Sequence, residues 1–187
     1  MIVRLERVCK GIGRARVAFT DLTQKDNSRT VVACLVPPRT FLVNSAPYLA
    51  FASGDEPDQA ACLGLMNSLP FDWQARRFAE MHLNFFILEG LIVPHLGDAD
   101  YAAVAEAAAR LSCVDERFED FAASVGVAFS PLDEAERERL RVEIDARVAR
   151  AWGLTPDDLA VICHDFTLRA VPVDYRERLT RRLTELR

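Results

Sequence analysis

Cysteine, histidine and lysine are scarce in this sequence, and their pattern excludes several kinds of site. The five cysteines are odd in number and scattered, no two form a Cys-x-x-Cys pair, and the three histidines lie far apart. We therefore expect neither a zinc site nor a disulfide framework, but buried, reduced thiols in a cytoplasmic protein. No apolar run is long enough for a signal peptide or a membrane span, so a membrane is not an expected partner.

Motifs for catalysis and cofactor binding are missing as well. A metal-dependent nuclease of the PD…(D/E)xK type needs a lysine after its acids, but Lys10 and Lys25 both precede Pro57-Asp58. The segment 11–16 lacks the third glycine of a dinucleotide fingerprint, and there is no GK[ST] phosphate loop. The sequence therefore predicts no catalytic residue, metal or cofactor within this chain.

Charge is distributed unevenly along the chain, whose net charge is −5. Residues 1–40 carry eight basic and three acidic side chains, whereas residues 98–187 carry thirteen basic and nineteen acidic ones. A basic front and an acidic rear allow an anionic partner at one end only. The alternative, a chance asymmetry on solvated surfaces, is equally compatible with charge alone.

Hydrophobic spacing divides the chain into two parts and predicts an α+β fold. Before residue 97, β-branched and alternating stretches predict short strands. The expected strands are 14–22, 29–36, one or two within 40–52, and one apolar strand or a pair of strands within 83–94. Two helices are expected between them, from Asp55 to about Leu69 and again after Pro70. We expect a small mixed sheet with two packed helices in a β-rich subdomain, residues 1–97.

The remaining residues, 98–187, predict a helical subdomain. Apolar positions from Tyr101 to Val125 are three or four residues apart, which indicates one long amphipathic helix. Residues typical of helix starts and ends predict further helices. One follows Ser130-Pro131 and ends at Trp152-Gly153, one runs from Thr155-Pro156 to about His164, and one starts near Tyr175.

Four motifs follow one another in order along the chain: "RVAFTDLTQKDNSRTVVACLVPP", "NSAPYLAF", "CLGLMNSLPFDWQARRF" and "HLNFFILEGLIVP". In this order they resemble the C-terminal target-recognition (specificity) region of fused restriction–modification DNA methyltransferases, namely the TaqI-like adenine methyltransferases and the larger type IIG enzymes. The order is also similar to half of a type I restriction specificity subunit. The resemblance covers nearly the whole chain.

Individual residues match the motifs of that family. The matched positions are Asp21, Asn27, Arg29, Thr30 and the strand 31–36, then Leu63, Gly64, Leu65, Met66, Asn67 and Ser68, then Leu91, Ile92, Val93 and Pro94. A helical tail motif is matched by Asp145, Val148, Ala149, Trp152, Gly153, Leu154, Thr155, Asp158, Leu159 and Ile162, with Trp152 where tyrosine is usual.

The resemblance implies sequence-specific recognition of double-stranded DNA for a type II adenine-N6 methyltransferase. The family's S-adenosylmethionine loop is absent, and Pro37-Pro38 is not its Asn/Asp-Pro-Pro-aromatic motif. We therefore expect catalysis, S-adenosylmethionine and any nuclease to belong to a methyltransferase or restriction domain upstream in a parent protein. The alternative is a helical protein-interaction or dimerisation module without independent DNA binding, with a homo-oligomer as one form.

Arginine binds both guanine and phosphate through its planar fork, so the basic residues are the candidate DNA contacts. The candidates are Arg14, Arg16, Lys25, Asn27, Arg29, Arg39, Arg76 and Arg77. Lys25 and Asn27 lie in the turn-rich segment and are the first choice, whereas Arg29 has an alternative role as the partner of an acid such as Asp21. Arg76 and Arg77 are adjacent on an expected helix, so only one of them is expected to reach a phosphate.

Overall fold

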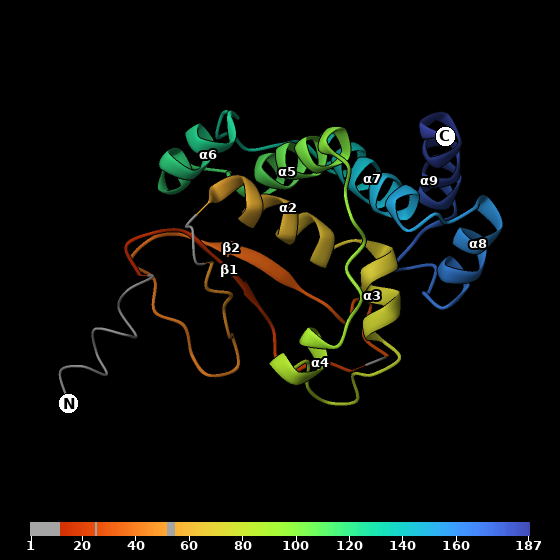
Figure 1. The fold of residues 1–187 in the computed structure, drawn as a ribbon, viewed down its shortest axis with the longest axis horizontal. Helices are drawn as coiled ribbons and strands as arrows, with labels where there is room; N and C mark the ends of the chain where they lie inside the picture. The colour runs from red at the N-terminus through yellow and green to blue at the C-terminus, as the bar shows by residue number, and fades with distance from the viewer. Residues whose placement is uncertain (1–11, 25, 52–54) are drawn as a thin grey trace.

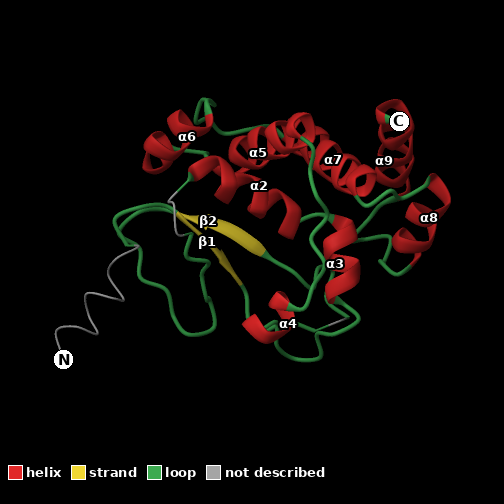
Figure 2. Cartoon of the chain, in the orientation of Figure 1, coloured by secondary structure: helices red, strands yellow, loops and turns green. Residues whose placement is uncertain are grey.

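The computed structural model describes residues 12–24, 26–51 and 55–187, which form an α+β fold (Figure 1, Figure 2). The strands β1 (Arg16–Phe19) and β2 (Ala33–Val36) pair antiparallel, with Arg16 opposite Val36. The α+β class is confirmed. In the described part of the chain the sheet has these two strands and is antiparallel, not mixed as predicted.

Helices make up most of the remaining structure. They are α2 (Glu56–Met66), α3 (Leu69–Ala75), α4 (Phe85–Glu89), α5 (Asp98–Ser112), the 3₁₀ turn η1 (Glu116–Phe118), α6 (Glu119–Val125), α7 (Glu134–Ala151), α8 (Pro156–His164) and α9 (Val173–Leu186). Helix α2 lies between the two strands and α5, while α7 packs against both α5 and α9 (Figure 1). The strands are thus covered on one face by two layers of helix.

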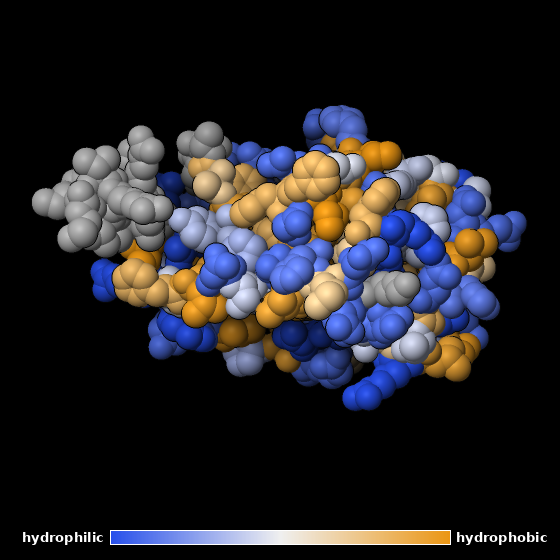
Figure 3. Space-filling model, turned by 90° about the horizontal axis from the view of Figure 1, so that it is seen from below, coloured by the Kyte–Doolittle hydropathy of each residue, from blue (hydrophilic) through white to orange (hydrophobic). Residues whose placement is uncertain are grey.

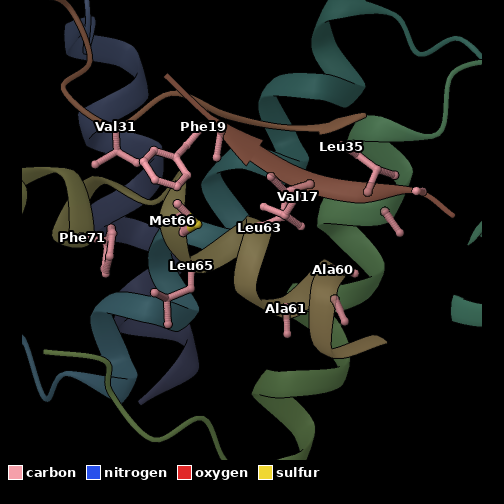
Figure 4. Close-up of a cluster of buried hydrophobic side chains, with 14 of the residues drawn as sticks. Val17, Phe19, Val31, Leu35, Ala60, Ala61, Leu63, Leu65, Met66 and Phe71 are labelled. Carbon is pink, nitrogen blue, oxygen red and sulfur yellow. The ribbon is translucent and has the colours of Figure 1, made fainter. Parts of the chain in front are cut away.

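The largest hydrophobic cluster joins the strands to these helices (Figure 4). Val17 and Phe19 on β1 are almost completely buried and face Leu63 and Met66 on α2. The same cluster continues into buried side chains of α5, η1 and α6. Residues on both sides of position 97 therefore share one core, and the division of the chain at that position stays a prediction.

Gly64 sets how closely α2 approaches α5. A Cβ atom at this position would lie 2.7 Å from Val104 Cγ1 and 3.2 Å from Ala108 Cβ, both on α5. Because these distances are shorter than ordinary van der Waals contacts, only glycine fits between the two helices without a shift. The glycine in the motif around α2 therefore has a packing role.

The predicted apolar strand or strands over 83–94 are wrong. The side chain of Asn84 accepts a hydrogen bond from the Ile87 N–H at 3.0 Å and caps the short helix α4. A capping side chain satisfies a helix-terminal donor, and here that local bond overrides the strand preference of the two phenylalanines that follow it.

The long helix predicted from Tyr101 to Val125 is interrupted. Helix α5 ends at Ser112, and the side chain of Asp115 accepts from the Arg117 N–H at 3.0 Å to start η1. The apolar spacing continues through the break because Phe118 and Phe121 still face the same core. Spacing alone therefore did not reveal the interruption.

The C-terminal helices agree with the sequence better than the N-terminal segments. Thr155 and Asp158 form a complete capping box at the start of α8, and Gly153 adopts φ +71° just after α7, as a helix stop requires. Helix α7 begins later than predicted, because Asp133 and not Ser130 caps it, by accepting from the Glu136 N–H at 2.8 Å.

Among the described residues, four cysteines are unpaired thiols, while Cys9 lies outside the described residues. Cys113 and Cys163 are buried as expected, but Cys34 is exposed. Burial raises the pKa of both Cys113 and Cys163 to about 11, so these thiols are protonated at neutral pH and poorly nucleophilic. None of the described helices is long and apolar enough to span a membrane.

Candidate nucleic-acid interface

Asp72 is the centre of a buried polar network. Its side chain is 0% exposed and accepts hydrogen bonds from the backbone N–H groups of Thr30 at 3.0 Å and Val31 at 3.2 Å. Arg29 Nε and Arg76 Nε each donate to the same carboxylate at 2.9 Å. A buried carboxylate needs this number of donors to offset the loss of water, so the network is structural in origin.

The break between α2 and α3 positions the network against β2. Asn67, at the end of α2, accepts from the Ala33 N–H at 3.1 Å and donates to the Ala33 carbonyl at 3.0 Å. Its side-chain amide thus pairs with the outer edge of β2 as another strand would. Arg29 also donates to the Asn67 carbonyl, which ties the same turn to the segment before β2.

A second buried acid connects this turn to the C-terminal helices. Asp145 on α7 accepts from the Leu69 N–H at 2.8 Å and from the Tyr175 hydroxyl at 2.7 Å. Complete burial raises the pKa of Asp145 above its usual value, and the nearby charge of Arg29 opposes this rise only in part. Burial and the adjacent Asp145 also raise the pKa of Tyr175.

The adjacent arginines Arg76 and Arg77 have different roles. Arg76 is 9% exposed, and besides binding Asp72 it donates to the carbonyls of Asn27 at 2.7 Å and Ser28 at 2.8 Å. Its guanidinium also stacks 4.1 Å from the ring centre of Phe166.

Arg77 is 48% exposed and pairs with Asp165 near the end of α8. Its guanidinium lies 4.6 Å from the ring centre of Trp73, whose indole N–H donates to the same carboxylate at 2.6 Å. Of the two side chains, that of Arg77 is the more exposed, although its guanidinium is paired with Asp165. Whether either arginine reaches a phosphate stays a prediction.

Three other candidates lie at the opposite end of the strands. Arg16 is buried, stacks 4.9 Å from the ring centre of Tyr48 and donates to the Thr40 carbonyl. Arg14 and Arg39 are exposed. Among the described residues, Arg39 is the one non-glycine residue with a positive φ, +61°, and its N–H donates to the Ile12 carbonyl at 2.6 Å.

The turn before β2 carries the remaining candidates. Asn27 is exposed, and its side-chain amide N–H donates a long hydrogen bond of 3.5 Å to Thr23 Oγ1. Lys25 lies outside the described residues. Arg29 was expected either to contact DNA or to pair with an acid such as Asp21. It does pair with an acid, which is Asp72 and not Asp21.

Asp21 bonds His82 instead, with its Oδ2 atom 3.0 Å from His82 Nδ1. The backbone joins the same two segments, because the Leu83 N–H donates to the Asp21 carbonyl at 2.7 Å. The pair therefore fixes the loop after α3 beside the end of β1.

The structure separates the basic candidates into two groups. Arg14, Arg16 and Arg39 flank the start of β1, and Asn27, Arg29 and Arg76 lie beyond its other end. A four-residue strand spans about 10 Å, so the two groups are separated by at least that length. The basic front of the sequence is thus not one patch.

Sequence reasoning missed Asp72, Asp145 and Asp165 as partners of the candidate residues. One signal was available, because Asp72 and Arg76 are four residues apart on one expected helix, which is the spacing of an ion pair. The other contacts join segments far apart in the chain, and no local pattern indicates them.

No group of three metal-ligating side chains comes together anywhere in 12–24, 26–51 and 55–187. Comparisons with protein-family models, curated proteins and solved structures found no match to this chain.

Proposed function

We propose that this chain recognises a specific sequence of double-stranded DNA for a restriction–modification enzyme that methylates adenine at N6. The observation that carries the proposal is the meeting of its motifs in space. Arg29 and Thr30 from one motif, and Asn67 from another, contact each other or Asp72, and Leu69 joins them to Asp145 of the helical tail. Motifs that are separate in the sequence thus form one scaffold.

The scaffold fixes the turn that holds Asn27. Arg76 binds two successive carbonyls of this turn, and Asp72 binds the two N–H groups at its end. The exposed amide of Asn27 is therefore held on a rigid support, which a residue that reads a base edge requires. An asparagine amide can bond both N6 and N7 of adenine in the major groove.

Arg39 supplies a phosphate contact at the other end of the strands. Its left-handed backbone costs about 1 kcal/mol in a residue other than glycine. Such strain persists only where the surrounding structure holds it, here with the Arg39 N–H bond to the Ile12 carbonyl at 2.6 Å, and strained residues are frequent at binding sites. The side chain of Arg39 is exposed and so accessible to a phosphate. Arg14 lies at the same end and adds a second cation.

In this proposal residues 1–97 recognise DNA and the helices of 98–187 contact the catalytic half. That half supplies S-adenosylmethionine and the adenine-binding motif, and the complete enzyme acts in the cytoplasm. The acidic surface of the C-terminal helices suits a protein contact better than a phosphate backbone.

The proposal is tested by selecting bound sequences from a random duplex library with the whole chain, at about 50 mM salt. We expect one sequence family to be enriched. Asn27→Ala should relax the preference at one base position, whereas Arg39→Gln should weaken all duplexes similarly and reduce the salt slope by about one.

Arg169→Gln is the matched control, because Arg169 is exposed in the C-terminal part and makes no ion pair among the described residues. It should bind as the unsubstituted chain does. Failure to bind any duplex, alone or with a methyltransferase half added, would contradict the proposal.

The second candidate function is a protein-interaction module without DNA binding. Four of the eight candidate DNA contacts have guanidinium groups that already bond other groups of this chain, which favours this function. They are Arg16, Arg29, Arg76 and Arg77. Light scattering after size exclusion distinguishes the two functions: a tight dimer that is indifferent to DNA supports the second.

A further inference from the structure

The segment 47–49 lies antiparallel beside β1, joined to it by a single bridge at Tyr48, and its outer edge is open. The Phe19 N–H donates to the Pro47 carbonyl at 3.0 Å, and the Leu49 N–H donates to the Val17 carbonyl at 2.8 Å. The two bonds flank Tyr48, so the backbone groups of Tyr48 point away from β1. Backbone groups alternate in direction along an extended chain, so we infer that those of Ala50 point the same way.

These outward groups have no hydrogen-bond partner in the part of the chain that the structure describes. Ala50 is also exposed, so its edge is accessible. An accessible strand edge presents unpaired donors and acceptors at the spacing of another strand, and proteins commonly cover such an edge or use it to bind a further strand.

Helix α4 lies opposite this edge and makes it one wall of a groove. The lining is formed by Tyr48, Leu49, Ala50 and Phe51 on one side and by Phe85, Leu88 and Glu89 on the other. Phe85 is 44% exposed, although its ring also packs edge-on against Phe19, 5.5 Å between ring centres. The groove therefore combines an open strand edge with apolar side chains held by the core.

The surface around α4 is also apolar. Phe86 is 85% exposed, and Met81, Ile92 and Val93, before and after the helix, are each more than 60% exposed. Figure 3 shows the face seen from below, the side on which α4 lies in Figure 1, and on it apolar residues form several patches between hydrophilic ones. Several large apolar side chains exposed near one another are typical of interaction surfaces in soluble proteins.

Glu89 gives the groove its charge. It is the one charged residue of the lining, it is exposed, and within the described residues it makes no ion pair. A basic side chain in a bound segment would therefore strengthen binding if it lay beside Glu89. A second copy of this edge would bring another Glu89 and not a cation, which favours a different protein as the occupant.

We propose that this groove binds an extended segment of a partner protein as an additional strand. The segment pairs with the backbone of Tyr48 and Ala50, sets apolar side chains against Phe85 and Leu88, and places a lysine or arginine beside Glu89. The inference does not depend on DNA recognition, since no residue of the groove is a candidate DNA contact.

The test uses the whole chain and a random nine-residue peptide library displayed on phage. We expect the enriched peptides to alternate apolar residues with others and to contain a basic residue. Binding of the synthetic peptides is then measured by fluorescence anisotropy. Ala50→Pro removes the outward N–H while leaving the Leu49 bond to β1, so it should weaken binding roughly tenfold.

Proline is tolerated on a strand edge that faces solvent, so Ala50→Pro should fold, which circular dichroism checks. The matched control is Ala128→Pro, because Ala128 is exposed, lies outside helices and strands, and has no hydrogen bond within the described residues. It should bind peptides normally. Glu89→Lys tests the charge and should shift the enriched residue from basic to acidic.

Three results would overturn the inference: no enrichment of any peptide, peptides that bind the Ala50→Pro variant as tightly as the unsubstituted chain, or self-association through this edge detected by light scattering. Duplex binding of the same variants keeps the two proposals separate. A variant that loses peptides but keeps DNA supports the groove alone, and a chain that binds peptides but no duplex contradicts only DNA recognition.

Discussion

Arg29 and Asp72 lie 43 positions apart in the chain, yet Arg29 Nε donates a hydrogen bond of 2.9 Å to Asp72 Oδ2. This contact joins the segment before β2 to α3. It also explains why an arginine that resembles part of a DNA-recognition motif has a structural role: its charge neutralises a carboxylate that water does not reach.

Replacement of Asp72 tests the network directly. Asp72→Ala leaves two guanidinium groups and two backbone N–H groups without their acceptor, so we expect a loss of about 3–5 kcal/mol in the free energy of unfolding. Urea denaturation measures it. Glu80→Ala is the control, since Glu80 is exposed and should change stability by less than about 0.5 kcal/mol. Equal losses in both variants would refute a central role for Asp72.

The two neighbouring arginines should respond differently to the same substitution. Arg76→Ala removes a nearly buried guanidinium from Asp72 and from two carbonyls, and we expect a cost of about 2–4 kcal/mol. Arg77→Ala removes a half-exposed ion pair and should cost less than about 1 kcal/mol. Thermal or urea unfolding of both variants ranks them, and the reverse ranking would contradict the assigned roles.

Most of the helical part could be predicted from the sequence because its signals are local. The capping box of Thr155 and the glycine after α7 lie within a few residues of the helix ends that they define. The strand prediction for segment 83–94 was wrong because an apolar run permits a strand and a helix equally. The cap formed by Asn84 decides for the helix.

The candidate site was less predictable. Composition identified the arginines, but partners such as Asp165 for Arg77 come from elsewhere in the chain and depend on the tertiary fold. The open edge at Tyr48 and Ala50 was equally hidden, since a sequence pattern indicates a strand but not whether its far side is paired.

Gly64→Ala tests the close approach of α2 and α5. The added methyl would overlap Val104, so we expect a loss of about 1–3 kcal/mol even though alanine favours helices. Gly13→Ala is the comparison, because no atom lies within 4 Å of a Cβ placed there. Both are measured by chemical denaturation. A Gly64→Ala variant of unchanged or higher stability would show that the helices separate without cost.

Arg39→Gly should separate stability from binding. Glycine adopts φ +61° without strain, so the variant should be more stable by about 0.5–1 kcal/mol, which a shift in the urea midpoint measures. Its affinity for duplex DNA should fall at the same time. A stabilised variant with unchanged affinity would remove Arg39 from the proposed interface.

The buried Asp145 predicts a pH dependence of stability. Its pKa is raised in the folded protein above its usual value of 3.8, so the folded state keeps a proton that the unfolded state releases. Its contribution to stability is therefore greatest below about pH 4 and falls as the pH rises towards the folded pKa.

Asp145→Asn cannot titrate, so its stability relative to the unsubstituted chain should improve as the pH rises, measured by urea unfolding at several pH values. Tyr175→Phe removes a hydrogen bond that lowers the pKa of Asp145 and should therefore extend the fall to higher pH. A stability difference between Asp145→Asn and the unsubstituted chain that does not vary with pH would contradict this assignment.

The fit between Gly64 and the face of α5 has a consequence for how such a protein can diversify. A chain assembled from parts of two parent sequences keeps its packing only if the joined parts still fit each other. A crossover near residue 97 would separate Gly64 from Val104 and Ala108. The residues of α2 and α5 that meet at Gly64 are therefore expected to change together and not one at a time.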